Sequence, residues 1–196
     1  TVIENNTLEF NVGISNGKES FTITNGSNIE GELVVPASIN GYPVTSIGSH
    51  AFEDCSGLTS ITIPDSVTYI GSHAFEGCSG LTSVTIGKDV RSIGKHSFAG
   101  CSSIQAFAVH PNNGTYKSIA GLLVTKDGKT LVAGTNGHVI VPCGVTRICD
   151  SAFSGRIGLT RITIPDGVMS IGDSAFSGCS GLTNLTIPDS VTNIGK

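Results

Sequence analysis

The chain has 196 residues, of which 38% are hydrophobic and 13% charged, and this composition fits a single globular domain with ample material for a core. A net charge of −4 without a basic cluster argues against nucleic acid and anionic membranes as partners. No apolar run approaches the roughly 20 residues that cross a bilayer, so we expect no direct membrane insertion of this fragment.

Residues 1–32 contain alternating apolar residues on both sides of the sequence SNGK. The dipeptide Asn16-Gly17 is a favoured two-residue hairpin turn. We therefore predict an N-terminal β-hairpin that covers the first turn of the structure that follows.

From residue 33 the chain is repetitive. The stretch LTSITIPDSVTYIGSHAFEGC, Leu58 to Cys78, recurs with small changes, and Phe52, Phe75 and Phe98 are 23 residues apart. A fixed period of this size indicates a solenoid in which each repeat buries its apolar face against its neighbours. The first coil carries a five-residue expansion around NGYP, which we expect to form a loop with Tyr42 as a contact residue.

Within one repeat, the alternation of Ile61 and Ile63 with Thr62 predicts a half-buried strand. Pro64 suits the end of that strand because it donates no backbone hydrogen bond. The segment around Phe75 is too short for an independent helix, so we expect a turn that places the ring in the core. Stacked repeats would lie about 4.8 Å apart, the spacing of strands in a sheet.

The period breaks after the third of these repeats, because Phe98 and Phe153 are 55 residues apart, which is 23 plus 32. The longer repeat spans about residues 107–141, and Asp127-Gly128 between apolar segments predicts a second β-hairpin. Tyr116 is a further candidate loop contact. The regular pattern resumes near Val139 and stops in mid-repeat at Lys196, from which we expect the natural protein to continue.

The pattern LxxIxIPxxVxxIGxxAFxxC over residues 33–196 resembles the BspA-type leucine-rich repeat, a variant found in bacterial surface proteins. The resemblance implies a secreted or cell-surface protein without enzymatic activity, in a family linked to adhesion. It also implies a right-handed solenoid with a cysteine ladder that makes weak backbone hydrogen bonds. It names no ligand.

Two columns of polar or reactive side chains follow from the period. Cys55, Cys78, Cys101 and Cys179 share one column, in which Arg156 takes the place of one cysteine. We interpret these cysteines as buried free thiols that accept hydrogen bonds, with disulfides or a metal site as alternatives. His50, His73 and His96 should form a surface row of stacked rings without a neighbouring carboxylate column, a poor metal site.

The sequence contains no arrangement that indicates catalysis. It lacks a GxSxG elbow, a GxGxxG or GKS/GKT loop and a paired-carboxylate pattern. We therefore predict no enzyme, no catalytic residue, no metal ligand and no cofactor.

The predicted architecture is an all-β solenoid about five coils deep, with an N-terminal hairpin over residues 1–32 and repeats over residues 33–196. The outward face of its strands is the candidate binding face, formed by Ser60, Thr62, Ser83, Thr85, Arg161, Thr163, Asn184 and Thr186. We expect it to contact an extracellular protein or glycan, such as host matrix protein or mucin. The alternative is a spacer domain with no ligand of its own.

Overall fold

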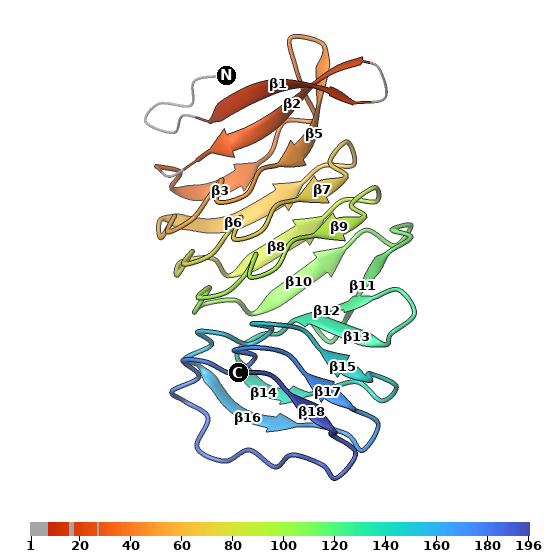
Figure 1. The fold of residues 1–196 in the computed structure, drawn as a ribbon. Helices are drawn as coiled ribbons and strands as arrows, with labels where there is room; N and C mark the ends of the chain where they lie inside the picture. The colour runs from red at the N-terminus through yellow and green to blue at the C-terminus, as the bar shows by residue number, and fades with distance from the viewer. Residues whose placement is uncertain (1–7, 16–17, 27) are drawn as a thin grey trace.

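The computed structural model describes residues 8–15, 18–26 and 28–196, and these residues form strands and turns without a helix (Figure 1). The strands wind into a solenoid of about eight turns, so the predicted all-β solenoid is confirmed. The predicted depth of about five coils was too low. It counted the regular 23-residue repeats, whereas the terminal hairpin and the inserted segment add turns of their own.

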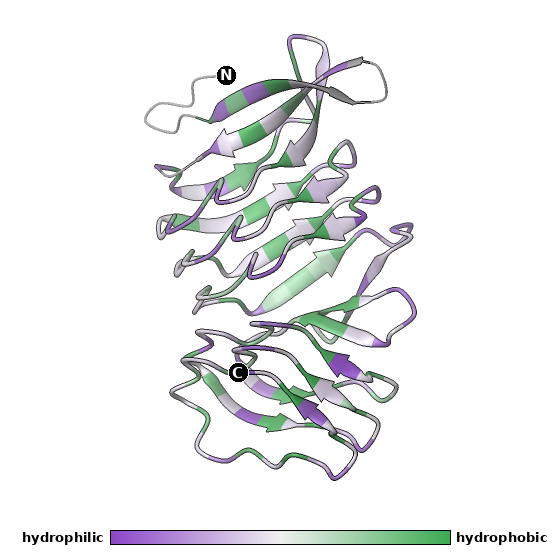
Figure 2. Cartoon of the chain, in the orientation of Figure 1, coloured by the Kyte–Doolittle hydropathy of each residue, from purple (hydrophilic) through white to green (hydrophobic). Residues whose placement is uncertain are grey.

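One side of the solenoid is a parallel sheet in the order β10-β8-β6-β3. Its strands are β3 (Gly31–Val34), β6 (Leu58–Ile63), β8 (Ser83–Ile86) and β10 (Ala106–Val109). Leu33, Ile61, Val84 and Phe107 lie in register and point into the core. Hydrophobic and polar residues alternate along β6 and β8, whereas β10 carries no polar residue (Figure 2). The alternation arises because successive side chains of a strand point to opposite faces.

A second sheet forms the other side, in the order β1-β2-β5-β7-β9. Its strands are β1 (Glu9–Ser15), β2 (Lys18–Asn25), β5 (Tyr42–Ile47), β7 (Tyr69–Ile70) and β9 (Ser92–Ile93). β1 and β2 pair antiparallel, and the predicted turn at 16–17 lies outside the described residues. The NGYP expansion is a tight β-hairpin: Asn40 and Gly41 form its turn, and β4 (Ser38–Ile39) pairs antiparallel with β5, which places Ile39 opposite Tyr42.

The turns that carry the phenylalanines stack from coil to coil. The ring centroids of Phe52 and Phe75 are 5.2 Å apart, and those of Phe75 and Phe98 are 5.4 Å apart. In this turn the main-chain N–H of Phe75 donates to the carbonyl of Ser97 in the next coil at 2.9 Å. Each coil therefore directs N–H donors towards the coil that follows it.

The inserted repeat restarts the solenoid. β11 (Tyr116–Ile119), β12 (Leu122–Thr125) and β13 (Thr130–Ala133) pair antiparallel, and β13 then pairs in parallel with β15 (Arg147–Ile148). This repeats the arrangement in which β2 follows β1 and pairs in parallel with β5. The N–H of Gly134 donates to the Ala152 carbonyl at 2.7 Å, as that of Gly26 donates to Ala51.

The molecule therefore consists of two stacked blocks, the first up to residue 121 and the second from residue 122. The second contains β14 (Gly137–Ile140), β16 (Leu159–Thr163), β17 (Ser170–Ile171) and β18 (Asn193–Ile194). Each block has its own cluster of buried hydrophobic residues, although Leu123 and Ala133 of the second block belong to the cluster of the first. We call the junction, where residues 93–98 face residues 132–151, the seam.

The cysteine column holds neighbouring coils together. The thiol of Cys78 donates to the Phe52 carbonyl at 3.0 Å, and the thiol of Cys101 donates to the Phe75 carbonyl at 3.0 Å. The cysteines are free thiols, as predicted, but they act as donors rather than acceptors. A carbonyl oxygen has only lone pairs to offer, so the S–H must supply the hydrogen.

Arg156 occupies the cysteine position at the seam and is fully buried. Its Nε donates to the Gly134 carbonyl at 3.0 Å, and its Nη1 reaches the carbonyls of Phe98 at 3.0 Å and Cys101 at 2.8 Å. A thiol contacts one or two carbonyls, whereas the guanidinium spans both blocks. Burial lowers the pKa of Arg156.

Candidate binding face

The first block brings four of the predicted face residues together in two columns. In register, Thr62 and Thr85 lie in one column and Ser60 and Ser83 in the other. All but the half-buried Ser60 are exposed. The register also places Ala108 in the first column and Ala106 in the second, as the alternation in the sequence indicates. It adds two residues that we did not predict, Val34, which is 71% exposed, in the first column and Glu32 in the second.

The same alternation in the sequence LVVP of the first coil would have pointed to Val34.

The prediction of continuous columns through all coils was wrong. Arg161 and Thr163 lie on β16, which pairs only with β14, so their partners in register are His138 and Ile140. The cause is the inserted hairpin, which separates β10 from β14 in the stack (Figure 1).

The last four face residues form a different arrangement. Asn184 and Thr186 lie outside any strand, in a segment that runs beside β16 without pairing with it. Together with Arg161 and Thr163 they line a cleft of about 590 Å³. The face therefore has two parts, a flat one on the first block and a hollowed one on the second.

The two parts differ in chemistry. The flat part offers hydroxyl and methyl groups, with Glu32 as the charged residue among its eight columnar positions. The hollowed part adds the opposite charges of Arg161 and Asp166 and lies beside Ile140, which is 63% exposed. Such groups can donate and accept hydrogen bonds and make apolar contacts, and a charged rim can orient a partner.

Of the two predicted tyrosine contacts, Tyr42 is exposed and Tyr116 is buried. Tyr42 is 43% exposed, and its ring packs edge-on against Phe21 at 6.3 Å. Tyr116 is only 7% exposed, and burial raises its pKa, so it cannot anchor a partner as we expected. The buried amide of Asn113 turns this segment inwards, because its Oδ1 accepts the N–H groups of Thr115 and Tyr116.

The predicted histidine row is present. The rings of His50 and His73 stack at 4.8 Å, and those of His73 and His96 at 5.0 Å. The expectation that no carboxylates lie nearby was wrong, because His50 Nδ1 lies 2.9 Å from Glu53, and His73 pairs with Glu76 in the same way. A glutamate three residues later reaches back across the turn. Among the described residues, no group of three or more histidine, cysteine and acidic side chains is placed to hold a metal ion.

The part of the chain that the structure describes contains no helix long and apolar enough to span a membrane.

Comparison with known proteins agrees with this architecture. The profile of the BspA type leucine rich repeat region matches residues 33–120 and 135–196 in six copies. The gap between the matched segments contains the hairpin of β12 and β13. No curated protein matches the chain at a significant level.

Several solved structures are similar. A leucine rich cell surface protein from Faecalibacterium prausnitzii is 30% identical over 100% of this chain and 50% of its own, with a TM-score of 0.57. A leucine-rich repeat protein from Eubacterium ventriosum is 23% identical over 90% of this chain and 63% of its own, with a TM-score of 0.57. A leucine rich repeat protein from T. pallidum is 25% identical over 95% of this chain and 83% of its own, with a TM-score of 0.52.

The chain thus spans about half of the first of these proteins and under two thirds of the second. The repeat matches cover well over half of the chain, and the stacked coils carry them in the structure. The chain therefore belongs to the BspA-type leucine-rich repeat family.

Proposed function

We propose that the chain is a non-enzymatic extracellular binding module of a bacterial surface protein, which contacts host matrix protein, mucin or glycan. The observation that carries this proposal is the flat face of the first block, where in-register columns of small side chains leave an open, nearly uncharged surface. A flat face of this kind suits many weak contacts with an extended partner. The hollowed part, with Arg161, adds a place for a protruding group.

Surface location is supported by the similar protein from Faecalibacterium prausnitzii, which is described as a cell surface protein. Because this chain spans half of that protein, location and adhesion both belong to the proposal.

A second candidate function is a spacer that holds another domain away from the cell. The burial of Tyr116 favours it, because only one of the two predicted tyrosine contacts is then exposed, and binding energy usually concentrates in such residues.

A binding panel of the purified chain against matrix proteins, mucins and common glycans tests the two functions. The variant Thr85→Arg places a long charged side chain at the centre of the flat face, and Tyr42→Ala removes the exposed ring. Thr192→Arg is the matched control, because Thr192 is exposed and lies outside the face. Saturable binding that Thr85→Arg or Tyr42→Ala weakens and Thr192→Arg leaves intact supports the module. The absence of saturable binding to every member of the panel favours the spacer.

A further inference from the structure

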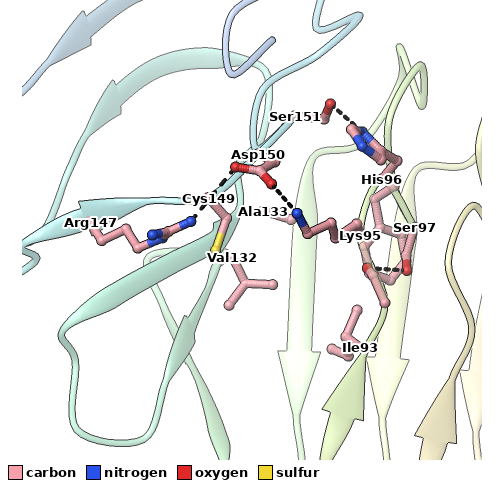
Figure 3. Close-up of a pocket in the computed structure, with 12 residues that line it drawn as sticks. Ile93, Lys95, His96, Ser97, Val132, Ala133, Arg147, Cys149, Asp150 and Ser151 are labelled. Atoms are coloured by element: carbon pink, nitrogen blue, oxygen red, sulfur yellow. Dashed lines mark hydrogen bonds and ion pairs between the residues drawn. The ribbon is translucent and has the colours of Figure 1, made fainter. Parts of the chain in front are cut away.

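The seam contains a partly open cavity of about 140 Å³ that the two blocks share (Figure 3). Ile93, Phe98 and Cys149 contribute apolar surface to it, as does Val132 from the hairpin. Lys95, Arg147 and Asp150 stand at its polar side. This cavity is separate from the binding face, since none of its lining residues belongs to the columns or to the cleft beside β16.

The restart of the solenoid leaves two main-chain donors of the first block without their usual acceptors. In the preceding coil, the N–H groups of His73 and Phe75 donate to the carbonyls of Lys95 and Ser97 at 3.0 and 2.9 Å. The matching donors at the seam are the N–H groups of His96 and Phe98.

Their expected acceptors can be identified from the bond that survives. Gly100 N–H donates to the Ser154 carbonyl at 3.0 Å, just as Gly77 N–H donates to Ala99 one coil earlier. Two steps of two residues, taken back from Gly100 and from Ser154, pair the Phe98 N–H with the Ala152 carbonyl and the His96 N–H with the Asp150 carbonyl. The Ala152 carbonyl is instead bonded to Gly134 N–H at 2.7 Å.

As a result, neither the His96 N–H nor the Phe98 N–H has a hydrogen-bond partner within the described residues 8–15, 18–26 and 28–196. In the regular coils these N–H groups point to the following coil, so at the seam they point into the space between the blocks. Both residues line the cavity. Phe98 is buried and His96 is half-buried. A main-chain N–H that is kept from water without an acceptor is rare and costly, so these donors indicate a missing partner.

The charges around the cavity favour an anion as that partner. Lys95 Nζ lies 3.1 Å from one oxygen of Asp150, and Arg147 Nη2 lies 3.7 Å from the other (Figure 3). Among the residues that line this cavity, two cations thus share one carboxylate, which leaves a local surplus of one positive charge, while Asp173 lies with the same three residues in an adjoining pocket. The Lys95 and Arg147 side chains are 75% and 53% exposed, so each keeps donors that face solvent.

We propose that the seam cavity binds a small organic carboxylate, with its oxygens towards the His96 and Phe98 N–H groups and its apolar tail against Ile93, Val132 and Cys149. Paired main-chain N–H groups are a common cradle for oxyanions. An apolar cavity of about 150 Å³ holds a molecule the size of benzene, so a tail of about three or four carbons fits. The site does not depend on the proposed adhesive function.

Sodium butyrate is the probe for this site. In a titration of the whole chain followed by ¹H–¹⁵N NMR, we expect the His96 and Phe98 amide signals to shift and to saturate with a Kd of about 1 mM or below. Two comparison ligands separate the parts of the proposal. n-Butanol has a similar tail without the charge, and sodium chloride at equal concentration supplies an anion without the tail.

Two variants locate the site. Val132→Phe fills the cavity and should abolish saturation, whereas Lys95→Gln should weaken binding about threefold, as expected for an exposed charge. Lys88→Gln is the matched control on the preceding turn, and melting curves of all variants establish that they fold. Equal shifts with butanol or chloride, shifts that Val132→Phe does not remove, or no saturation at 50-fold the expected Kd would each overturn the proposal.

Discussion

Arg156 provides the sharpest test of how the two blocks are joined. We consider the variant Arg156→Met, which keeps most of the volume and removes the guanidinium. Four carbonyls accept hydrogen bonds from this group, on Gly134, Phe98, Cys101 and Ser154.

The magnitude depends on which carbonyls find another donor. The Cys101 carbonyl also accepts the Ile104 N–H, and the Ser154 carbonyl also accepts the Gly100 N–H. Among the described residues, the carbonyls of Gly134 and Phe98 have no other donor. Two buried acceptors without partners cost about 1–3 kcal/mol each, so we expect a loss of about 4 kcal/mol in the free energy of unfolding.

An opposing effect must be weighed. The guanidinium is buried with its Nη2 unpaired, so its removal relieves a desolvation cost. Buried ionic groups can be replaced at no loss when all partners are replaced together. Here the partners are main-chain carbonyls, which no substitution removes, so the loss should prevail.

Thermal unfolding measures the outcome. For a chain of this length, about 4 kcal/mol corresponds to a fall in Tm of about 10 °C. Arg161→Met, at an exposed arginine, is the control and should change stability by less than about 0.5 kcal/mol. Arg156→Lys keeps the charge without the fork and should be nearly as destabilising as Met. If Arg156→Met melts with the wild type, the guanidinium does not join the blocks.

Three further predictions follow from the structure. The Lys95 ammonium, above all, holds the pKa of Asp150 below its ordinary value of 3.8. The stability that the wild type has over Asp150→Asn is therefore present above about pH 4 and is lost as the pH falls through the lower folded-state pKa. Urea unfolding from pH 7 to 2.5 measures this difference in stability, and a difference that grows towards low pH contradicts the prediction. Cys143 is exposed, so it should be the first cysteine of the native protein to react with a thiol reagent. Under non-reducing conditions the fast phase of this reaction should be present in the wild type and absent in Cys143→Ser. A Cβ on Gly71 would lie 2.3 Å from a main-chain nitrogen of the preceding coil, so Gly71→Ala should lower the free energy of unfolding by at least about 2 kcal/mol. A Cβ on Gly114 would meet nothing within 4 Å, so Gly114→Ala should leave the Tm within about 2 °C of the wild type.

The solenoid could be predicted because its signal is repeated. The Phe, Gly and Ile of the pattern appear in the same position of several coils, so a misassigned residue in one repeat is corrected by comparison with the others. The stacking of Phe75 between Phe52 and Phe98 follows from the 23-residue period alone. The inward and outward alternation of β6 and β8 follows equally from the sequence.

The breaks in the period limited the prediction of the site. A hairpin is recognised locally from Asp127-Gly128, but its effect on the stack depends on which strand β13 pairs with, and this is a long-range contact. The sequence therefore aligned Thr163 with Thr85, while the structure aligns it with Ile140. Tyr116 failed for a related reason: an exposed tyrosine and a buried one look alike in a segment without periodicity, and the side-chain bonds of Asn113 decide between them.

The seam shows why a solenoid can restart in mid-chain and what this leaves behind. A new hairpin brings its own donors, as when Gly134 N–H takes the Ala152 carbonyl, so the preceding coil must lose bonds. Side chains restore some of the lost donors: Arg156 serves the carbonyls of Phe98 and Cys101, and Asn113 Nδ2 serves those of Gly87 and Val90.

Both of these side chains replace donors, and within the described residues no side chain supplies an acceptor to the N–H groups of His96 and Phe98. The junction is therefore short of acceptors rather than donors. Water or an anion must supply them, and the surplus positive charge of Lys95 and Arg147 over Asp150 favours the anion. The N–H groups left over by the restart thus call for an acceptor, and the charges at its edge select an anion as that acceptor.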